Sequence, residues 1–339
     1  MKNSLIATTI ALSLLLTLFV AFKPSSTVKS ITAYNNVFNS QDLNDQDLFS
    51  FSVISDNHGA SPFDNIQMAR TAKWIAEGED EFVLGLGDHL VKNESNNFLS
   101  FILRDHWWKN NFYPSIADGE NSYFGSSQAD WASGGQLLSA LNFQNRRNTI
   151  VRENGAEYYT KFSIKGVNVH YISLHYPDQP YTLEESFPTD SRNYLIETLK
   201  KIQKSNNDII IVAAHSRWGS WIDDLNENQK SYVMSKCDLL LSGTTHYFER
   251  RVPQGFENRG ALVVNASSVN RARFGNHNGF LKIHVMTKPL ALVVQHVNTN
   301  DQEMHLMSTP DSYVKYINGA VYPLNFENLN ASDFIAKAY

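Results

Sequence analysis

The sequence predicts an α/β fold, and three observations carry that prediction. Apolar runs of strand length alternate with segments of helical periodicity from residue 49 onward. Several of these runs end abruptly in acidic or imidazole side chains, which is where open α/β sheets place their ligands. The chain has 339 residues, of which 42% are hydrophobic, so it can bury a large core in one big domain or two modest ones.

The expected elements follow one another in order from residue 49. Strands are expected at the start of Phe49–Gly59, at Phe82–Leu86, at Tyr113–Ala117, within Glu157–His175, and at Asp208–Ala214, Cys237–Ser242, Ala261–Asn265, Gly279–Val285 and Leu290–Val297. Helices are expected at Ser61–Glu77, Asn96–Phe112 and Ser191–Lys204. Lys165 and Gly166 form the expected hairpin turn. The polar stretch Asp118–Ala156 is expected to be a long loop over the site, because loops of that length usually carry function.

The amino terminus has the pattern of an export signal. Lys2 precedes an apolar run of about 18 residues, Leu5–Phe22, which is the length of a long signal peptide or of one short membrane helix. We therefore divide the chain into a signal peptide or membrane anchor at 1–30, a linker at 31–47, a folded domain at 48–300 and a C-terminal extension at 301–339. The domain is expected outside the cytoplasm, in the periplasm or secreted, either released or tethered to the membrane through residues 5–22.

Charge and cysteine content exclude several classes of protein. The formal charge is -5, so no basic field is present to attract nucleic acid. The single cysteine, Cys237, excludes an internal disulfide framework and a cysteine-rich zinc site. It lies in an apolar run, and we expect it in the core.

The residues at the strand ends have the character of metal ligands. Asp56 and His58 are one residue apart, so their side chains leave on the same side if the strand stays extended through them. Asp88, His215 and His246 follow later apolar runs in the same way. Carboxylates and imidazoles suit divalent or trivalent transition ions. Their recurrence favours metal ligation over unrelated polar turns.

The order of these residues along the chain resembles that of the calcineurin-like metallophosphoesterases. The series is Asp56-x-His58, Gly87-Asp88, Asp118 or Asn121, His215 and Gly243-x-x-His246. The resemblance extends over roughly Phe49 to Val297. In that family the DxH, GD, GNH[DE], H and GHxH motifs hold two metal ions inside a β-sandwich. The resemblance implies a four-layer α/β/β/α sandwich flanked by helices. It also implies one metal site made of Asp56, His58, Asp88 and His246, with Asp88 bridging to a second ion.

The second site departs from the family pattern. By resemblance Asp118 takes the place of the asparagine ligand and Gly119 that of the catalytic histidine, with Asn121 as a less favoured ligand. Thr244 replaces one imidazole of GHxH. The second ion would then depend on Asp88, Asp118 and His215. We expect one or two ions in all, Fe, Mn or Zn, with an oxygen-preferring ion such as Mn²⁺, Mg²⁺ or Ca²⁺ at the weakened site.

The resemblance implies hydrolysis of a phosphate mono- or diester, on a small molecule or a surface, by a metal-activated hydroxide. His89 and Arg217 are the catalytic candidates. His89, like His175, is either a proton donor or a hydrogen-bonded structural histidine. Arg217 is either a phosphate clamp or a partner in a surface salt bridge. The alternative function is that of a degenerate one-metal binding or scaffold protein without turnover.

Overall fold

The computed structural model describes most of the chain beyond residue 48. The described ranges are 49–57, 62–90, 98–117, 131–153, 156–175, 189–215, 221–253, 255–256, 260–270, 278–287, 290–299, 312–317 and 321–323. The predicted leader at 5–22 and the linker lie outside these ranges. Within them, no helix is long and apolar enough to cross a membrane.

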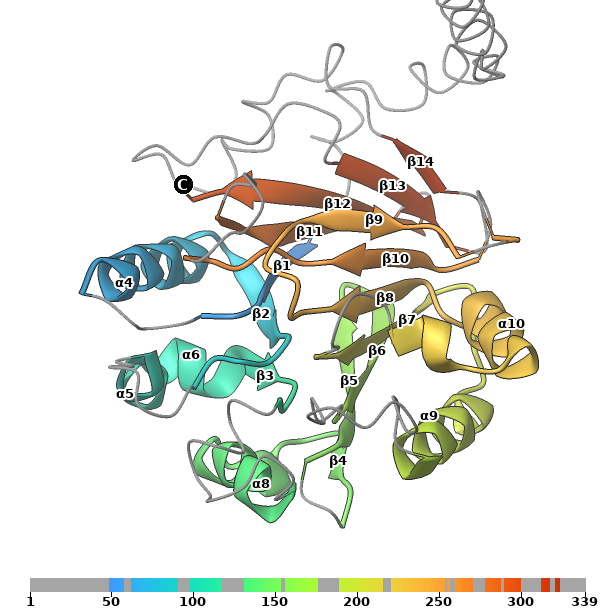
Figure 1. The fold of residues 1–339 in the computed structure, drawn as a ribbon, viewed down its shortest axis with the longest axis horizontal. Coiled ribbons are helices and arrows are strands. Elements are labelled where there is room, and N and C mark those ends of the chain that lie inside the picture. Colours follow the sequence, from blue (N-terminus) through green and yellow to red (C-terminus); the bar gives the residue numbers. More distant parts are fainter. Residues whose placement is uncertain are drawn as a thin grey trace, which may run out of the picture.

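Two seven-stranded sheets lie at the centre of the fold (Figure 1). The first sheet has the strand order β14-β13-β12-β11-β1-β2-β3, and the second has β4-β5-β6-β7-β8-β10-β9. The strands of the first sheet are β1 (Phe49–Ile54), β2 (Asp80–Gly85), β3 (Phe112–Pro114), β11 (Gly279–Thr287), β12 (Leu290–Asn298), β13 (Ser312–Tyr316) and β14 (Val321–Pro323). Those of the second are β4 (Thr149–Val151), β5 (Tyr158–Ile164), β6 (Val167–Leu174), β7 (Asp208–Ala214), β8 (Leu239–Ser242), β9 (Glu249–Arg251) and β10 (Leu262–Asn265).

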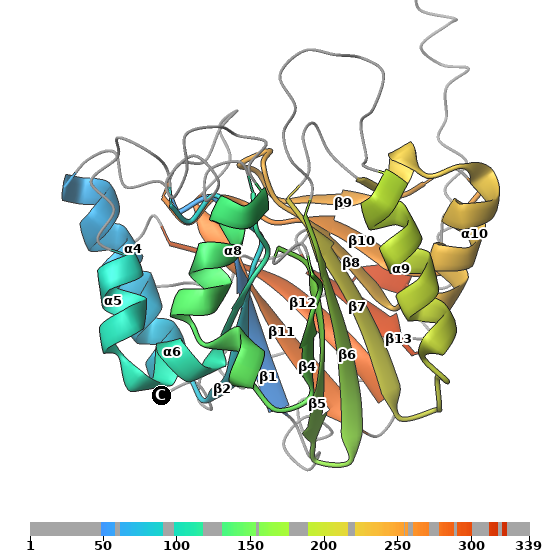
Figure 2. The ribbon, with the colours of Figure 1, turned by 90° about the horizontal axis from the view of Figure 1, so that it is seen from below.

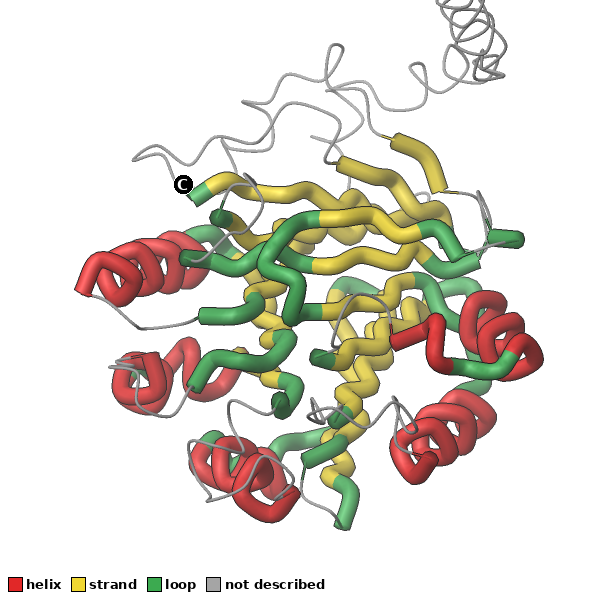
Figure 3. Tube along the Cα trace, viewed as in Figure 1, coloured by secondary structure: helices red, strands yellow, loops and turns green. Residues whose placement is uncertain are grey.

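Helices cover the outer faces of both sheets, as Figure 2 shows from below and Figure 3 shows by element type. On the side of the first sheet lie α4 (Pro62–Glu77), α5 (Phe98–Arg104) and α6 (His106–Asn111), with α8 (Trp131–Ala140) nearby. On the side of the second lie α9 (Thr189–Lys201) and α10 (Glu227–Lys236). Two 3₁₀ turns, η1 (Phe143–Asn145) and η2 (Trp221–Asp224), complete the described elements. The predicted α/β fold with four layers, α/β/β/α, is confirmed.

The strands that precede the expected ligands run parallel within each sheet. β1, β2 and β3 are parallel neighbours, with Ile54 beside Gly85 and Gly85 beside Pro114. β6, β7, β8 and β10 are parallel in the second sheet, with Ala214 beside Ser242. Because parallel neighbours end at the same edge, the residues that follow these strands gather there.

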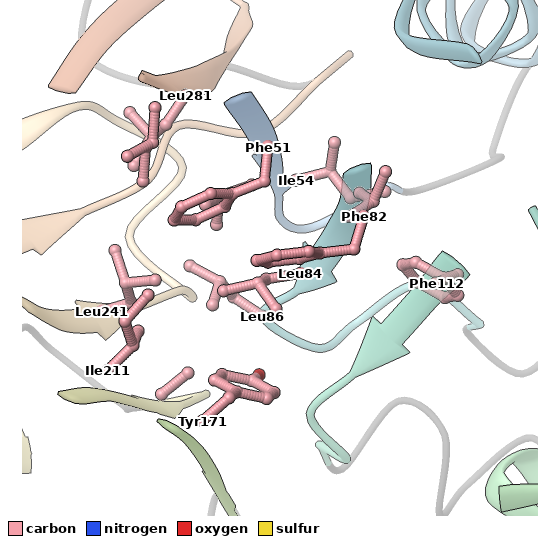
Figure 4. Packing of buried hydrophobic residues seen from close by; sticks show 14 of the residues in the cluster. Phe51, Ile54, Phe82, Leu84, Leu86, Phe112, Tyr171, Ile211, Leu241 and Leu281 are labelled. Atoms are coloured by element: carbon pink, nitrogen blue, oxygen red, sulfur yellow. The ribbon is translucent and has the colours of Figure 1, made fainter. Parts of the chain in front are cut away.

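Alternating side chains of β7 show how the core is divided. Ile209, Ile211 and Ala213 belong to the large cluster between the sheets, whereas Ile210, Val212 and Ala214 belong to a second cluster beneath the helices α9 and α10. Such a strand is buried on both faces, as its continuous apolar run predicts. In Figure 4, Ile211 and Leu241 of the second sheet approach Phe51 and Leu84 of the first.

Stacked aromatic rings join the two sheets. The ring centroids of Phe51 and Phe82 are 4.6 Å apart, and those of Phe82 and Phe162 are 4.1 Å apart. Phe82 is 1% exposed, so its burial contributes about 1.5–3 kcal/mol. This packing holds the two sheets, and therefore their strand ends, in one arrangement.

Two expected segments differ from the structure. The single helix expected at Asn96–Phe112 is two helices, because the Asp105 side chain accepts a hydrogen bond from the Trp108 amide at 2.9 Å and caps a new helix there. The long loop expected at Asp118–Ala156 contains α8, η1 and β4. Leu137, Leu138 and Phe143 of this stretch are buried, so tertiary packing stabilises elements that its polar composition obscures.

Elements near the C-terminus also refine the sequence analysis. Cys237 is buried as expected, yet it is the C-terminal cap of α10 rather than a strand residue. Two elements, α10 and the short edge strand β9, were not predicted from the sequence. The expected boundary at residue 300 separates β12 from β13, which pairs with it in the same sheet. The hairpin turn is confirmed, because Lys165 and Gly166 both have the positive φ, 48° and 81°, that a tight two-residue turn needs.

Candidate metal centre

The candidate ligands lie on loops that leave the strand ends in unusual backbone conformations. β1 ends at Ile54, and Asp56 has a φ of 52°. Asp88 also has a φ of 52°, and Thr244 and His246 have values of 81° and 60°. A left-handed conformation at such residues costs about 1–3 kcal/mol, and strain of this kind clusters at functional sites. The strand therefore does not stay extended through Asp56, which was the condition for placing Asp56 and His58 on one side.

Asp56 and His246 form the first pair of the centre. Nε2 of His246 lies 3.1 Å from Oδ1 of Asp56. The other carboxylate oxygen, Oδ2, accepts hydrogen bonds from the Ser55 hydroxyl and, at 3.0 Å, from the backbone N–H of Thr244. These two donors orient the carboxylate, so that Oδ1 is directed toward the imidazole. Both side chains are at most 5% exposed.

Asp88 and His215 form the second pair. Nε2 of His215 lies 3.4 Å from Oδ2 of Asp88. Nδ1 of His215 lies 2.7 Å from the carbonyl oxygen of Leu86, which only accepts, so Nδ1 carries the ring hydrogen. In the neutral ring this leaves the lone pair on Nε2, toward Asp88. A backbone carbonyl that holds the far nitrogen in this way is the usual support of a metal-binding histidine.

The two pairs converge on one place. One ligand atom from each of Asp56, Asp88 and His215 lies within 4.8 Å of the others. Ligand atoms at about 2.0–2.2 Å from one ion lie roughly 2.8–3.1 Å apart in octahedral geometry and roughly 3.3–3.6 Å apart in tetrahedral geometry. The separations of 3.1 Å and 3.4 Å within the two pairs match that spacing. Two carboxylates and two imidazoles are also a donor set that Mn²⁺, Fe or Zn²⁺ accepts, so these residues fit a metal ion.

Glycines allow the loops from the two sheets to approach closely. A Cβ on Gly243 would lie 2.4 Å from Ser55 Oγ and 2.8 Å from His215 Nδ1. Gly87 has a φ of +93°, and a Cβ there would lie 2.8 Å from the Cβ of His215. A larger side chain at either position would separate residues that form the centre.

Thr244 stands where the family motif has an imidazole. Its hydroxyl is buried, and among the described residues no hydrogen-bond partner contacts that oxygen. Its backbone N–H, by contrast, is engaged by Asp56. Thr244 therefore contributes to the first pair through its backbone, and its side chain offers one weak oxygen donor to an ion.

His89 lies in the core behind Asp88. Its ring is fully buried and meets Phe112 edge-on, with 5.3 Å between ring centroids. Nε2 accepts a hydrogen bond from the Gly87 amide at 3.2 Å, and Nδ1 lies 2.8 Å from the Asn57 side-chain nitrogen. Both ring nitrogens thus contact the loops that carry Asp56 and Asp88. This geometry fits the structural role of His89 better than that of a proton donor to substrate.

His175 follows β6 beside the centre. Leu174 pairs with Ala214, so His175 and His215 continue neighbouring parallel strands. Burial, and secondarily the charge of His215, lowers the pKa of His175 to about 3. At neutral pH the ring is therefore uncharged and lacks the extra proton of a general acid. Its backbone N–H donates to the buried carboxylate of Glu157 at 3.3 Å.

Several predicted site residues lie outside the described ranges. They are His58, Asp118 and Arg217, together with Gly119 and Asn121. Their assigned roles stay predictions. Of the predicted metal ligands, the structure brings together Asp56, Asp88, His215 and His246.

The supporting residues of the centre escaped the sequence analysis. Ser55 and Asn57 flank Asp56, and Ser268 reaches its backbone from the loop after β10. Serine and asparagine are common in turns, so their presence after strands carried no distinctive signal.

No family model and no curated protein matches the sequence. Among solved structures, GAP50 of Plasmodium, described as the anchor in the inner membrane complex, is 14% identical with a TM-score of 0.47, over 86% of this chain and 95% of its own. The phosphoesterase YfcE of E. coli is 15% identical with a TM-score of 0.35, over 76% and 96%. Vacuolar protein sorting 29 of Cryptosporidium parvum is 12% identical with a TM-score of 0.37, over 80% and 99%. Identities this low limit the likeness to the fold.

Proposed function

We propose that this chain, whose fold and order of strand-end ligands are those of calcineurin-like metallophosphoesterases, is a metal-dependent phosphoesterase. The observation that carries the proposal is the arrangement of two carboxylate–imidazole pairs, one member of each from either sheet. Ligand atoms of Asp56, Asp88 and His215 lie within 4.8 Å of one another, and His246 lies 3.1 Å from Asp56. The backbone strain at Asp56, Asp88 and His246 adds support, because such strain persists where a site must be held in advance of binding.

The two pairs of residues would have different roles in such a site. Asp56 and His246 would hold one ion from a buried position, with the carboxylate oriented by Ser55 and Thr244. Asp88 and His215 would hold the more accessible side, where the Asp88 side chain is 16% exposed. Divalent ions bound there would lower the pKa of water and neutralise charge that grows on phosphorus during ester hydrolysis.

We infer the substrate class from the proton donors available among the described residues. By resemblance Gly119 takes the place of the family's catalytic histidine, and His89 and His175 are held in ways that do not suit an acid. General acid catalysis typically contributes 10²–10⁴-fold in rate. We therefore propose that aryl esters, whose leaving group needs no proton, react far faster than alkyl esters.

A metal reconstitution assay tests the function. The full chain is stripped with EDTA, reloaded with Mn²⁺, and assayed on p-nitrophenyl phosphate, bis-p-nitrophenyl phosphate and a matched alkyl ester. We expect Mn²⁺-dependent turnover of an aryl ester that Asp56→Asn abolishes and Asp208→Asn retains, since Asp208 begins β7 at the opposite end of the strand. Absence of metal-dependent turnover on every ester overturns the enzymatic function. Equal rates on alkyl and aryl esters overturn the preference for leaving groups.

The second candidate function is a one-metal binding or scaffold protein. Thr244 favours it, because a hydroxyl replaces an imidazole ligand at the weaker site. One ion per chain by elemental analysis, with no turnover in the same assay, supports this alternative. Two ions with turnover support the enzyme.

We also propose that the domain acts outside the cytoplasm, on a small-molecule or surface phosphoester. The support is the apolar run Leu5–Phe22 after Lys2. A reporter active only outside the cytoplasm, fused after Ser30, tests the location. A stable fusion without reporter activity contradicts it.

A further inference from the structure

We propose that Ser268 is a positioning residue that holds Asp56 in its metal-binding conformation. The inference rests on the metal site of the proposed function and deepens it. Ser268 lies in the loop after β10, and none of the motifs named in the sequence analysis includes this residue. It acts on the backbone of Asp56 rather than on an ion.

The contact is direct and fully enclosed. The Ser268 hydroxyl donates a hydrogen bond of 2.7 Å to the backbone carbonyl oxygen of Asp56, 212 residues away in sequence. Ser268 and Asp56 are both 0% exposed. A hydrogen bond in such surroundings is not exchanged for water, so its loss leaves a buried carbonyl with one donor fewer.

Asp56 needs such support because its backbone is strained. Its φ of 52° is unfavourable for a residue with a Cβ. Two backbone bonds hold the same turn: the Asp56 N–H donates to Gly87 O at 3.1 Å, and the Val269 N–H donates to Ser55 O at 3.3 Å. Ser268 adds the bond that fixes the peptide on the far side of Asp56. Together these contacts determine where the carboxylate of Asp56 points.

The segment that carries Ser268 is itself anchored to the centre. The Ala266 N–H donates to Ser242 O at 2.9 Å, which ties the segment to the end of β8. The Gly279 N–H donates to Ser268 O at 2.9 Å, which ties it to the start of β11. Ser268 therefore joins the end of β10 in the second sheet to Asp56 in the first, at the level where the two pairs converge.

Ser267 offers a matched control. It precedes Ser268, is equally buried, and also uses its hydroxyl, which lies 2.7 Å from Nε2 of His296. Replacing either serine with alanine removes one oxygen and one short buried hydrogen bond of 2.7 Å, and at Ser268 it also removes two longer contacts of 3.4 Å with Asn270. Only the bond of Ser268 reaches Asp56 among the contacts of these two hydroxyls in the described structure.

The test compares Mn²⁺ affinity with stability in Ser268→Ala, Ser268→Cys and Ser267→Ala. Each full-length variant is titrated with Mn²⁺ by calorimetry and unfolded in urea without metal. We expect Ser268→Ala to weaken Mn²⁺ binding about 10–100-fold, as is typical when an orienting partner of a ligand is lost. Ser268→Cys, with a weak S–H donor of similar size, should fall between Ser268→Ala and the wild type. Ser267→Ala should bind within about threefold of the wild type, since no ligand of the metal loses its orienting partner.

The outcomes separate the inference from the proposed function. Equal Mn²⁺ affinities in Ser268→Ala and Ser267→Ala overturn the positioning role, even if both lower the urea midpoint. If Ser268→Ala does not fold, Ser268→Cys with wild-type affinity overturns it equally. A wild-type chain that binds no Mn²⁺ overturns the metal site, and the inference with it.

Discussion

Asp56 with His246 and Asp88 with His215 each join a carboxylate from the first sheet to an imidazole from the second, at 3.1 Å and 3.4 Å. They differ in how they are held. The carboxylate of Asp56 is fully buried and receives donors from Ser55 and Thr244, whereas the side chain of Asp88 is 16% exposed.

This difference assigns the two pairs different tasks. A buried carboxylate that is oriented by protein donors binds an ion with little reorganisation, as a permanent site requires. A more accessible carboxylate leaves room for water and substrate beside the ion. By resemblance, the departures from the family motifs at Thr244 and Gly119 weaken the second site, to which Asp88 and His215 are assigned. The first pair is therefore expected to bind metal more tightly than the second.

The largest expected effect comes from Asp88→Asn. The amide keeps the shape of the side chain but removes the charge that both ions would share. We therefore expect metal affinity to fall at least about 100-fold, which is more than the loss of a residue that only orients a ligand would cause. Elemental analysis after dialysis measures it. His215→Ala should retain more metal than Asp88→Asn, and the distant Asp208→Asn should retain the wild-type content. Equal metal in wild type and Asp88→Asn contradicts a bridging role.

Gly243→Ala should damage both pairs at once. The added Cβ would approach Ser55 Oγ on one side and His215 Nδ1 on the other. We expect a loss of about 1–3 kcal/mol in stability from overpacking and about a tenfold loss of Mn²⁺ affinity. Gly166→Ala is the control, because its added Cβ meets nothing within 4 Å and causes only backbone strain. Metal binding that survives in Gly243→Ala would show that the loops move apart freely.

A pH series compares the centre with a distant buried imidazole. Burial lowers the pKa of His284 in β11 to about 3, and Lys282 contributes in the same direction. In the unfolded chain His284 takes up a proton near pH 6.5, whereas in the folded chain it does so only near pH 3. The free energy of unfolding therefore falls as the pH decreases from about 6.5 to about 3. His175, whose pKa is also lowered to about 3 by burial, contributes to the pH dependence of stability in the same direction.

For each such group the slope reaches at most about 1.4 kcal/mol per pH unit. Urea unfolding of the metal-free chain between pH 6.5 and 4 measures the slope. We expect His284→Gln to remove the contribution of one group, without changing Mn²⁺ affinity at pH 7. An unchanged slope would mean that His284 takes up its proton in the folded state.

The smallest expected effect belongs to Thr244→Ala. The contact of Thr244 with Asp56 uses the backbone N–H, which alanine keeps. We expect the affinity of the tighter Mn²⁺ site to change less than about threefold, below the effect of a lost orienting partner. A larger loss at the weaker site alone would identify the hydroxyl as a ligand there. A loss at the tighter site would contradict the division between the two pairs.

The signal for the candidate ligands is local in the sequence, and four of them lie among the described residues. Asp56, Asp88, His215 and His246 each follow an apolar run, and parallel strands bring such ends to one edge whatever the rest of the chain does. The sequence did not predict α10, whose amphipathic pattern is weak, or α8, which lies in a stretch whose polar and glycine-containing composition is typical of a loop. The sequence pattern also predicted one helix in place of α5 and α6. The capping residue Asp105 lies within a helical pattern, where an aspartate is expected to be a surface residue of a continuous helix.

The sequence by itself determined the alternation of strands and helices and the order of the candidate ligands at the strand ends, because periodicity and strand ends are properties of neighbouring residues. The four-layer arrangement was implied by the family resemblance. Only the tertiary structure decided the left-handed turns at Asp56 and Asp88, the inward position of His89 and the support from Ser268. Each of these depends on contacts between loops of different strands. The hydrogen bond that reaches Asp56 from a residue 212 positions away leaves no trace in the pattern around either residue.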